Sequence, residues 1–326
     1  MGAPMRTLST LILAMALAAC LHAADKKKDD PSQIGDRDVD KGINFYSLEK
    51  EMALGKALAQ QVQRQAKMVD DPLVSEYLNR LCQNLARNSD AKVPLSCELI
   101  DGEQPNAFAL PGGYIFVYSG LIKIADEEDE LAGAVAHEIA HVAARHMTRR
   151  ATKNEMADVA SIPLSVLLGG WTGYAARQAA GLAIPMTFLK FSRDDESEAD
   201  YLGVQYLYAA GYDPNGALSI FEKIESLRKT EPGLMARVIS THPMDADRIR
   251  KTQEEIQRIL PDKPEYVVTT SEYRAMRDRL IGLGDRRKTD DRDGRPRLRV
   301  APGSGAPPER DGPGQRPTIR REELVD

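Results

Sequence analysis

The segment AVAHEIAHVAARH, residues 134–146, carries two histidines four positions apart, with a glutamate directly after the first. On a helix this spacing puts His137 and His141 on one face, about one turn apart. In the pattern His-Glu-x-x-His the two imidazoles bind Zn²⁺, and the glutamate, here Glu138, takes a proton from the attacking water. Acidic residues before the segment and two arginines after it suit the helix dipole. The sequence therefore predicts a zinc-binding helix over residues 129–149.

A catalytic zinc site needs a third protein ligand, and this helix does not supply one. The metzincin pattern would require a histidine where the chain has Met147. His146 lies about 140° round the helix from His141, so we expect it to have an ordinary helix-surface role. Glu155 would lie about 21 Å from His141 on a continued helix and is rejected.

Better candidates lie on a later predicted helix, residues 192–210. Glu196 and Asp200 are four positions apart and share a face of that helix, whereas Glu198 points elsewhere. One carboxylate could bind the metal while the other accepts an N–H from a ligand histidine. The alternative is an acidic helix start that only complements the helix dipole. Spacing and composition leave both interpretations open.

The N-terminus resembles an export signal, which we assign to residues 1–20. A short apolar run, residues 8–19, follows Arg6 and ends in the lipobox-like sequence Leu-Ala-Ala-Cys. In that pattern Cys20 is lipidated and becomes the new N-terminus; ordinary cleavage near Ala23 is the alternative. Either route takes the mature chain out of the cytoplasm.

The other two cysteines, Cys82 and Cys97, would then lie in an oxidising compartment. They could pair as a disulfide or remain two buried thiols, and the sequence alone does not decide between these.

Composition divides the remaining chain. Residues 21–44 are charged and predict a flexible tether, residues 45–284 form the folded domain, and residues 285–326 predict a disordered tail. The apolar, glycine-broken stretch 159–184 predicts a helical hairpin or lid, with a membrane-touching surface as the alternative. The net charge of −5, without a basic block in the middle of the chain, argues against nucleic-acid binding.

Hydrophobic periodicity predicts a mainly helical α+β fold with a small antiparallel sheet. Besides the helices already named, we expect helices at 48–67, 72–87, 215–227 and 245–260, strands at 97–100 and 114–118, and a short strand and helix within 265–280.

His137-Glu138-x-x-His141, followed by Glu196-x-x-Ala199-Asp200, resembles the M48 family of metallopeptidases. The stretches NAFALPGG, residues 106–113, and Thr-His-Pro, residues 241–243, resemble further motifs of its soluble periplasmic and mitochondrial branch. The resemblance covers about residues 45–260 and implies a zincin-like (gluzincin) domain. It is nearest to the periplasmic members that maintain outer-membrane β-barrel assembly, without the tetratricopeptide array common in that type.

The resemblance also assigns site residues. One Zn²⁺ per chain would be held by His137, His141 and Glu196, with Glu138 as general base and Asp200 orienting a ligand histidine. A substrate strand would pair with the segment formed by Gly113, Tyr114, Ile115, Phe116 and Val117. The turn before it, Pro111-Gly112-Gly113, would let the substrate backbone approach closely.

Two more residues have open roles. His242 could donate to the oxyanion, bind zinc as a fourth ligand and displace the water, or be structural. Arg248 could bind a developing anion or pair with an acidic residue.

The expected function is that of a zinc metalloendopeptidase in the bacterial periplasm, tethered to the outer membrane if Cys20 is lipidated. Its substrates would be misfolded or stalled envelope proteins, and the β-barrel assembly machinery is a possible partner. The alternative is a chaperone-like assembly factor with rare or regulated proteolysis. A purely structural zinc site would not need a glutamate at position 138.

Overall fold

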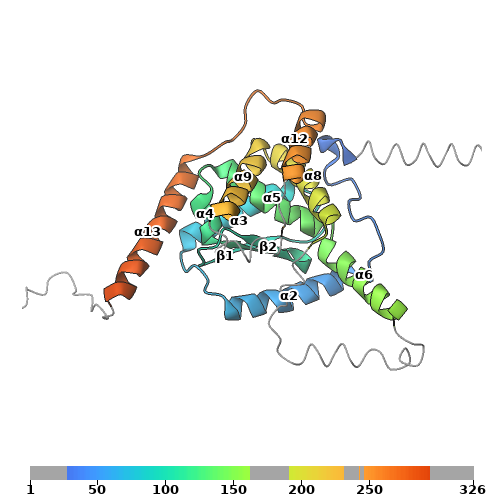
Figure 1. The fold of residues 1–326 in the computed structure, drawn as a ribbon, viewed down its shortest axis with the longest axis horizontal. Coiled ribbons are helices and arrows are strands. Elements are labelled where there is room, and N and C mark those ends of the chain that lie inside the picture. Colours follow the sequence, from blue (N-terminus) through green and yellow to red (C-terminus); the bar gives the residue numbers. More distant parts are fainter. Residues whose placement is uncertain (1–27, 162–190, 231–241, 243–245, 294–326) are drawn as a thin grey trace, which may run out of the picture. The chain divides into compact units, whose positions relative to one another are not determined.

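The computed structural model describes residues 28–161, 191–230, 242 and 246–293 (Figure 1). Contacts divide the chain into two units, Met1–Leu283 and Gly284–Asp326, and the fold and site below belong to the first. The predicted signal peptide and residues 162–184 of the apolar stretch lie outside the described residues. Among the helices that are described, none has the length and apolar character needed to cross a membrane.

Helix α5, Glu128–Ala143, carries the two motif histidines and is buried along its whole length. Its N-terminus is capped by Glu130, whose carboxylate accepts the backbone N–H groups of Asp126 and Glu127. Three helices pack around it (Figure 1): α3 (Pro72–Arg87), α8 (Arg193–Ala209) and α9 (Asn215–Thr230). The apolar side chains around α5 are therefore buried against neighbouring elements.

The chain leaves helical geometry directly after α5, at Arg145, which has a φ of 54°. Left-handed backbone is costly for a residue with a side chain. Here the Arg145 guanidinium is held by Asp40, by Glu51 and by a backbone carbonyl, which offsets that cost. A new helix, α6 (His146–Ser161), starts at the next residue. The prediction of one continuous helix over residues 129–149 is therefore wrong in its last turn.

The sheet has three strands in the order β1-β3-β2: β1 is Ser96–Ile100, β2 is Ala107–Leu110 and β3 is Tyr114–Tyr118. Strands β2 and β3 are antiparallel, but β1 runs parallel to β3, so the sheet is mixed and the predicted all-antiparallel sheet is wrong. The reason is topological, because the chain crosses from β1 over the position of β3 and returns through a tight turn. The rest of the predicted fold class, a mainly helical α+β domain, is confirmed.

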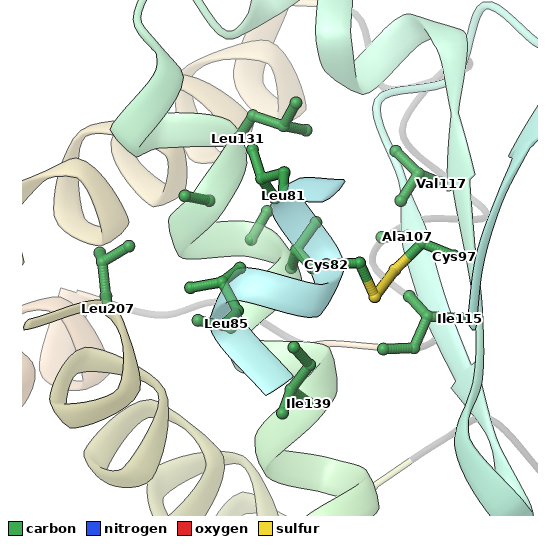
Figure 2. Close-up of a cluster of buried hydrophobic side chains, with 14 of the residues drawn as sticks. Leu81, Cys82, Leu85, Cys97, Ala107, Ile115, Val117, Leu131, Ile139 and Leu207 are labelled. Atoms are coloured by element: carbon green, nitrogen blue, oxygen red, sulfur yellow. A yellow bond between two sulfur atoms is a disulfide. The ribbon is translucent and has the colours of Figure 1, made fainter. Parts of the chain in front are cut away.

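Both faces of the sheet are buried, since strand side chains alternate between two cores. Ile115 and Val117 of β3 face α3 and α5, as Figure 2 shows, whereas Phe116 faces α2 (Leu48–Gln65). The sheet therefore forms a middle layer that supports α5 from one side.

Cys82 of α3 and Cys97 of β1 are joined by a disulfide, with their Cα atoms 6.1 Å apart (Figure 2). The structure thus decides between the two alternatives left open by the sequence. The bond ties the helix that packs on α5 to an edge strand of the sheet.

Residues 28–44 are not a free tether, contrary to the prediction for this part of the chain. Arg37 is buried, and its Nε donates to Asp90 at 2.8 Å while Nη1 donates to Gln205 of α8 at 2.6 Å. Val39 is 1% exposed and belongs to the main core. The buried charge of this segment, on Arg37, therefore pairs with side chains of the folded domain and is not exposed to solvent.

The C-terminal part of the first unit contains α12 (Ala246–Ile259) and most of α13 (Ser271–Asp293). Helix α12 packs on α8 and α9, and the α13 side chains Tyr273, Met276 and Leu280 are buried. In the second unit, residues 284–293 are helical, so disorder from residue 285 is wrong for this stretch. The rest of the predicted tail lies outside the described residues.

Removing the disulfide with Cys82→Ala and Cys97→Ala should lower the free energy of unfolding by about 3 kcal/mol, the loop-entropy value for a closed loop of this size. Urea denaturation measures the change. Reductant should lower the wild-type midpoint toward that of the double variant and leave the variant unaffected. A wild-type midpoint insensitive to reductant would contradict the assignment.

Asp129, in the first turn of α5, is 5% exposed. Burial, followed by the nearby Asp213 carboxylate, raises its pKa to about 7. The unfolded chain ionises this carboxyl near pH 4, so the native state loses stability as the pH rises from about 4 to about 7. We expect Asp129→Asn to raise the Tm, and by more at pH 8 than at pH 5. The exposed Asp38→Asn is the control, and an equal gain from Asp129→Asn at both pH values would be the contrary result.

Candidate metal centre

Four side chains bring ligand atoms within 4.8 Å of one another: His137, His141, Glu196 and His242. The Nε2 atoms of His137 and His141 are 3.1 Å apart, and Glu196 oxygens lie 3.5 and 3.6 Å from them. His242 Nδ1 lies 3.4 Å from His137 Nε2 and 3.0 Å from Glu196 Oε1. Of these four residues, only His242 keeps appreciable exposure.

These spacings fit a metal ion. Nitrogen and oxygen ligands 2.0–2.2 Å from a tetrahedral Zn²⁺ are separated from each other by about 3.3–3.5 Å. Metal binding also requires neutral imidazoles and an ionised carboxylate. Burial, followed by the charge of His137, lowers the pKa of His141 well below its usual value. Burial opposes ionisation of Glu196, but His242 and His137 lower its pKa well below the usual range.

The surrounding carboxylates favour positive charge at this position. Burial lowers the pKa of His137, yet hydrogen bonding to Asp200 and Glu196 outweighs it and raises the pKa to about 10. A bound divalent cation would satisfy the same carboxylates. The donor set of nitrogen and oxygen atoms is one that Zn²⁺ accepts.

Helix α8 places its carboxylates against α5 because the two helices approach closely at Gly203. A Cβ atom added there would lie 3.2 Å from the Cα and the backbone nitrogen of His137. Glu196 and Asp200, one helical turn apart, both face the motif histidines, while Glu198 faces another direction. The absence of a side chain at residue 203 thus allows the carboxylates to reach α5.

Asp200 Oδ1 lies 3.0 Å from His137 Nδ1, the ring nitrogen turned away from the cluster. Arg248 of α12 donates Nε and Nη2 to Asp200, both at 2.8 Å, and its Nη1 lies 2.8 Å from Glu196 Oε2. Of the two roles considered for Arg248, the structure therefore shows pairing with acidic residues. Burial raises the pKa of Asp200, but the Arg248 charge outweighs this and keeps it below the usual value.

His146 does not lie on the helix surface, which corrects the prediction. It is fully buried, its Nδ1 is 2.9 Å from His141 Nδ1, and its Nε2 is 3.1 Å from Glu198 Oε2. The physical reason is the helix break at Arg145, which abolishes the angular separation expected for a continuous helix. Residues 143–146 are Ala, Ala, Arg and His, none of which usually breaks a helix, so the break has no local sequence signal.

Phe191 is a second neighbour of the site that sequence reasoning missed. Its ring stacks on His141 with the centroids 3.9 Å apart. Glu155, which was rejected as a ligand, accepts from the Tyr46 hydroxyl at 2.7 Å and is absent from the cluster.

Glu138 is 3% exposed, and its Oε2 has no hydrogen-bond partner among the described residues. Its Oε1 lies 3.3 Å from His242 Nε2. A small cavity beside it has an apolar wall to which Ala107, Leu121, Ala134, Phe221 and Ile224 contribute. A second cavity, on the His141 side, is lined by residues that include Ala109, Leu110 and Phe191.

The predicted substrate strand is wrong, because β3 lies between β1 and β2 and is paired along both edges from Tyr114 to Val117. The turn glycines also serve packing rather than substrate access. A Cβ on Gly112, whose φ is 73°, would lie 2.6 Å from Met52 Cα, and one on Gly113 would lie 2.1 Å from the Pro94 carbonyl oxygen. The edge strand nearest the cluster is β2, whose alanines line the two cavities.

Proteins with sequences similar to this chain are described as proteases or metalloendopeptidases. A relative from Vibrio cholerae, described as a beta-barrel assembly-enhancing protease, is 32% identical over 291 residues, covering 85% of this chain and 57% of its own. The beta-barrel assembly-enhancing protease of Escherichia coli (strain K12) is 27% identical over 84% of this chain and 56% of its own. Mitochondrial metalloendopeptidase OMA1 of Schizosaccharomyces pombe is 36% identical over 56% of this chain and 51% of its own.

The chain thus spans about half the length of the curated relatives it matches. Residues 72–256 match the protein family described as "Peptidase family M48". This range includes all four residues of the cluster and Arg248. This match extends over more than half of the 326 residues. The chain belongs to peptidase family M48.

Proposed function

We propose that this chain is a zinc-dependent endopeptidase. The observation that carries the proposal is the convergence of His137, His141 and Glu196 beside a buried glutamate, one of whose oxygens has no hydrogen-bond partner among the described residues. These three residues would hold the ion. When bound, zinc supplies Lewis acidity that activates water and polarises a carbonyl.

Glu138 would move the proton. Its Oε2 is buried and without a hydrogen-bond partner among the described residues, so it is available to accept a proton from the attacking water. The same oxygen would then give that proton to the leaving amine. Asp200 and Arg248 would keep His137 and Glu196 oriented, because each holds one of them from outside the cluster.

His242 would act as a fourth donor of the resting site. Its Nδ1 lies 3.4 Å from His137 Nε2 and 3.0 Å from Glu196 Oε1, within the group of atoms that would bind the ion. In that position it competes with water for the same place, so hydrolysis requires the ring to move. The oxyanion-binding role remains the second candidate, since Nε2 faces Glu138.

The substrate would bind in an extended form along the edge of β2, which corrects the earlier assignment to β3. An edge strand can pair with an incoming chain through backbone hydrogen bonds, while side chains enter flanking pockets. The cavity beside Glu138 has an apolar wall, which favours substrates with an apolar side chain there. Unfolded protein offers such extended apolar segments.

We place the enzyme in the bacterial periplasm, with lipid attachment at Cys20 and a role in quality control of misfolded or stalled envelope proteins. The export-like N-terminus and the names of the bacterial relatives support this. The β-barrel assembly machinery would be its partner. A chaperone-like assembly factor is the second candidate function, favoured by His242 Nδ1, which lies 3.0 Å from Glu196 Oε1, where it would displace the attacking water.

Glu138→Gln should keep zinc bound and reduce cleavage of unfolded casein by at least about 100-fold, because the proton acceptor is lost. Zinc content by mass spectrometry and initial cleavage rates measure both effects. Glu155→Gln, on α6 and outside the cluster, is the matched control and should cleave at the wild-type rate. Wild-type cleavage by Glu138→Gln would remove Glu138 from its assigned role.

The same variant separates the two candidate functions in cells. If the chain acts by proteolysis, Glu138→Gln will not rescue an envelope-assembly defect caused by loss of the wild-type protein. Rescue at the wild-type level would favour the assembly factor.

His242→Ala should raise cleavage of a short fluorogenic peptide several-fold while zinc stays bound, because the competing donor is removed and three protein ligands remain. Peptide cleavage and zinc content are measured on the same preparation. Loss of cleavage with unchanged zinc content would instead assign the oxyanion role.

A further inference from the structure

Two polar residues beside the cluster have no part in the chemistry proposed above: His146 at the start of α6 and Glu198 of α8. His146 is completely buried, and the side chain of Glu198 is 21% exposed. They form a chain of contacts that starts at His141 and leads away from the metal ligands.

With a metal ion on His141 Nε2, hydrogen bonding along this chain has one direction. His141 turns Nε2 toward the other ligands, so the ring nitrogen that carries hydrogen in a metal-binding imidazole is Nδ1. That nitrogen lies 2.9 Å from His146 Nδ1, which must therefore accept. The hydrogen of His146 is then on Nε2, 3.1 Å from the Glu198 carboxylate, to which it donates.

Glu198 is held as an anion at the far end of the chain. Lys28 Nζ lies 2.7 Å from its Oε1, and Arg149 Nη1 lies 3.3 Å from its Oε2. A fixed anion accepts from His146 and so selects one tautomer of that ring.

The two motif histidines are therefore supported in parallel ways. Asp200 faces the outer nitrogen of His137 directly, at 3.0 Å. Among the described residues, the corresponding nitrogen of His141 reaches a carboxylate through His146. Phe191 stacks on the ring of His141 and restricts its rotation, but it provides no acceptor for the Nδ1 hydrogen.

We propose that His146 and Glu198 are positioning residues that fix the tautomer and the orientation of His141 and thereby set the metal affinity of the site. This inference rests on the proposed function, because it takes His141 as a metal ligand. Outer partners of metal-binding histidines typically change metal affinity by 10–100-fold when they are removed.

The experiment compares His146→Leu, which fills the space without an acceptor, with His146→Asn, whose Oδ1 takes the place of Nδ1. Zinc affinity is measured for each full-length variant by competition with a chromophoric chelator. We expect about 10–100-fold weaker binding for His146→Leu and affinity close to wild type for His146→Asn. Glu198→Ala removes the anion without touching α5 and should weaken binding by a smaller factor. Glu155→Gln is the control and should bind zinc as the wild type does.

Thermal unfolding of the metal-free variants separates positioning from folding. Near wild-type metal-free stability with weakened zinc binding supports the inference. If His146→Leu does not fold, the zinc affinities of the other two variants decide. Weaker binding by Glu198→Ala than by His146→Asn then supports the inference. Zinc affinity within twofold of wild type for folded His146→Leu, or for Glu198→Ala, would overturn the inference, as would His146→Asn binding as weakly as His146→Leu. A wild-type chain that binds no zinc would instead remove the proposed function itself.

Discussion

The structure depends on the contact between α5 and α8, where carboxylates are buried against imidazoles. Burying Glu196 and Asp200 costs several kcal/mol for each ion unless opposite charge is close by. Arg248 provides one such charge to both residues, and the motif histidines face the remaining oxygens. The site is therefore built around an excess of negative groups that a bound cation would balance. Charge compensation, together with the close approach of the two helices at Gly203, fixes how α8 meets α5 at this point.

Apolar packing holds α5 itself in place. The main core surrounds it with α3, α8, α9 and one face of the sheet, and the Cys82–Cys97 disulfide connects two of these supports. The other face of the sheet is closed by α2, which approaches the turn at Gly112 too closely for a side chain there, and the Pro94 carbonyl does the same at Gly113. The histidines consequently project from a helix with little freedom to shift. A rigid scaffold of this kind keeps ligand atoms at fixed spacing before any ion arrives.

The sequence predicted most helices, because their apolar periodicity is strong and local. It also singled out Glu196 and Asp200, since i, i+4 spacing determines which side chains share a helix face. It did not predict the break at Arg145, because the left-handed backbone there is maintained by Asp40 and Glu51, residues about a hundred positions earlier. The prediction for the sheet is wrong for a related reason, since strand order also depends on contacts between distant parts of the chain. Local pattern identifies a strand, but its neighbours are chosen by the crossover of the chain, so a strand expected at the edge lies in the centre.

The outer partners of the cluster connect it to segments far away in the sequence. Arg248, which pairs with Glu196, connects the cluster to α12. Lys28, which pairs with Glu198, connects it to the N-terminal segment. The same segment is anchored again at Arg37, whose partner Asp90 also accepts from Tyr206 of α8. Any ion that binds only the folded cluster stabilises the whole native state by mass action. Because these segments contact the cluster from outside, that stabilisation would extend to contacts that the four cluster residues do not make themselves. Metal binding at this cluster would thus be coupled to the docking of the N-terminal segment.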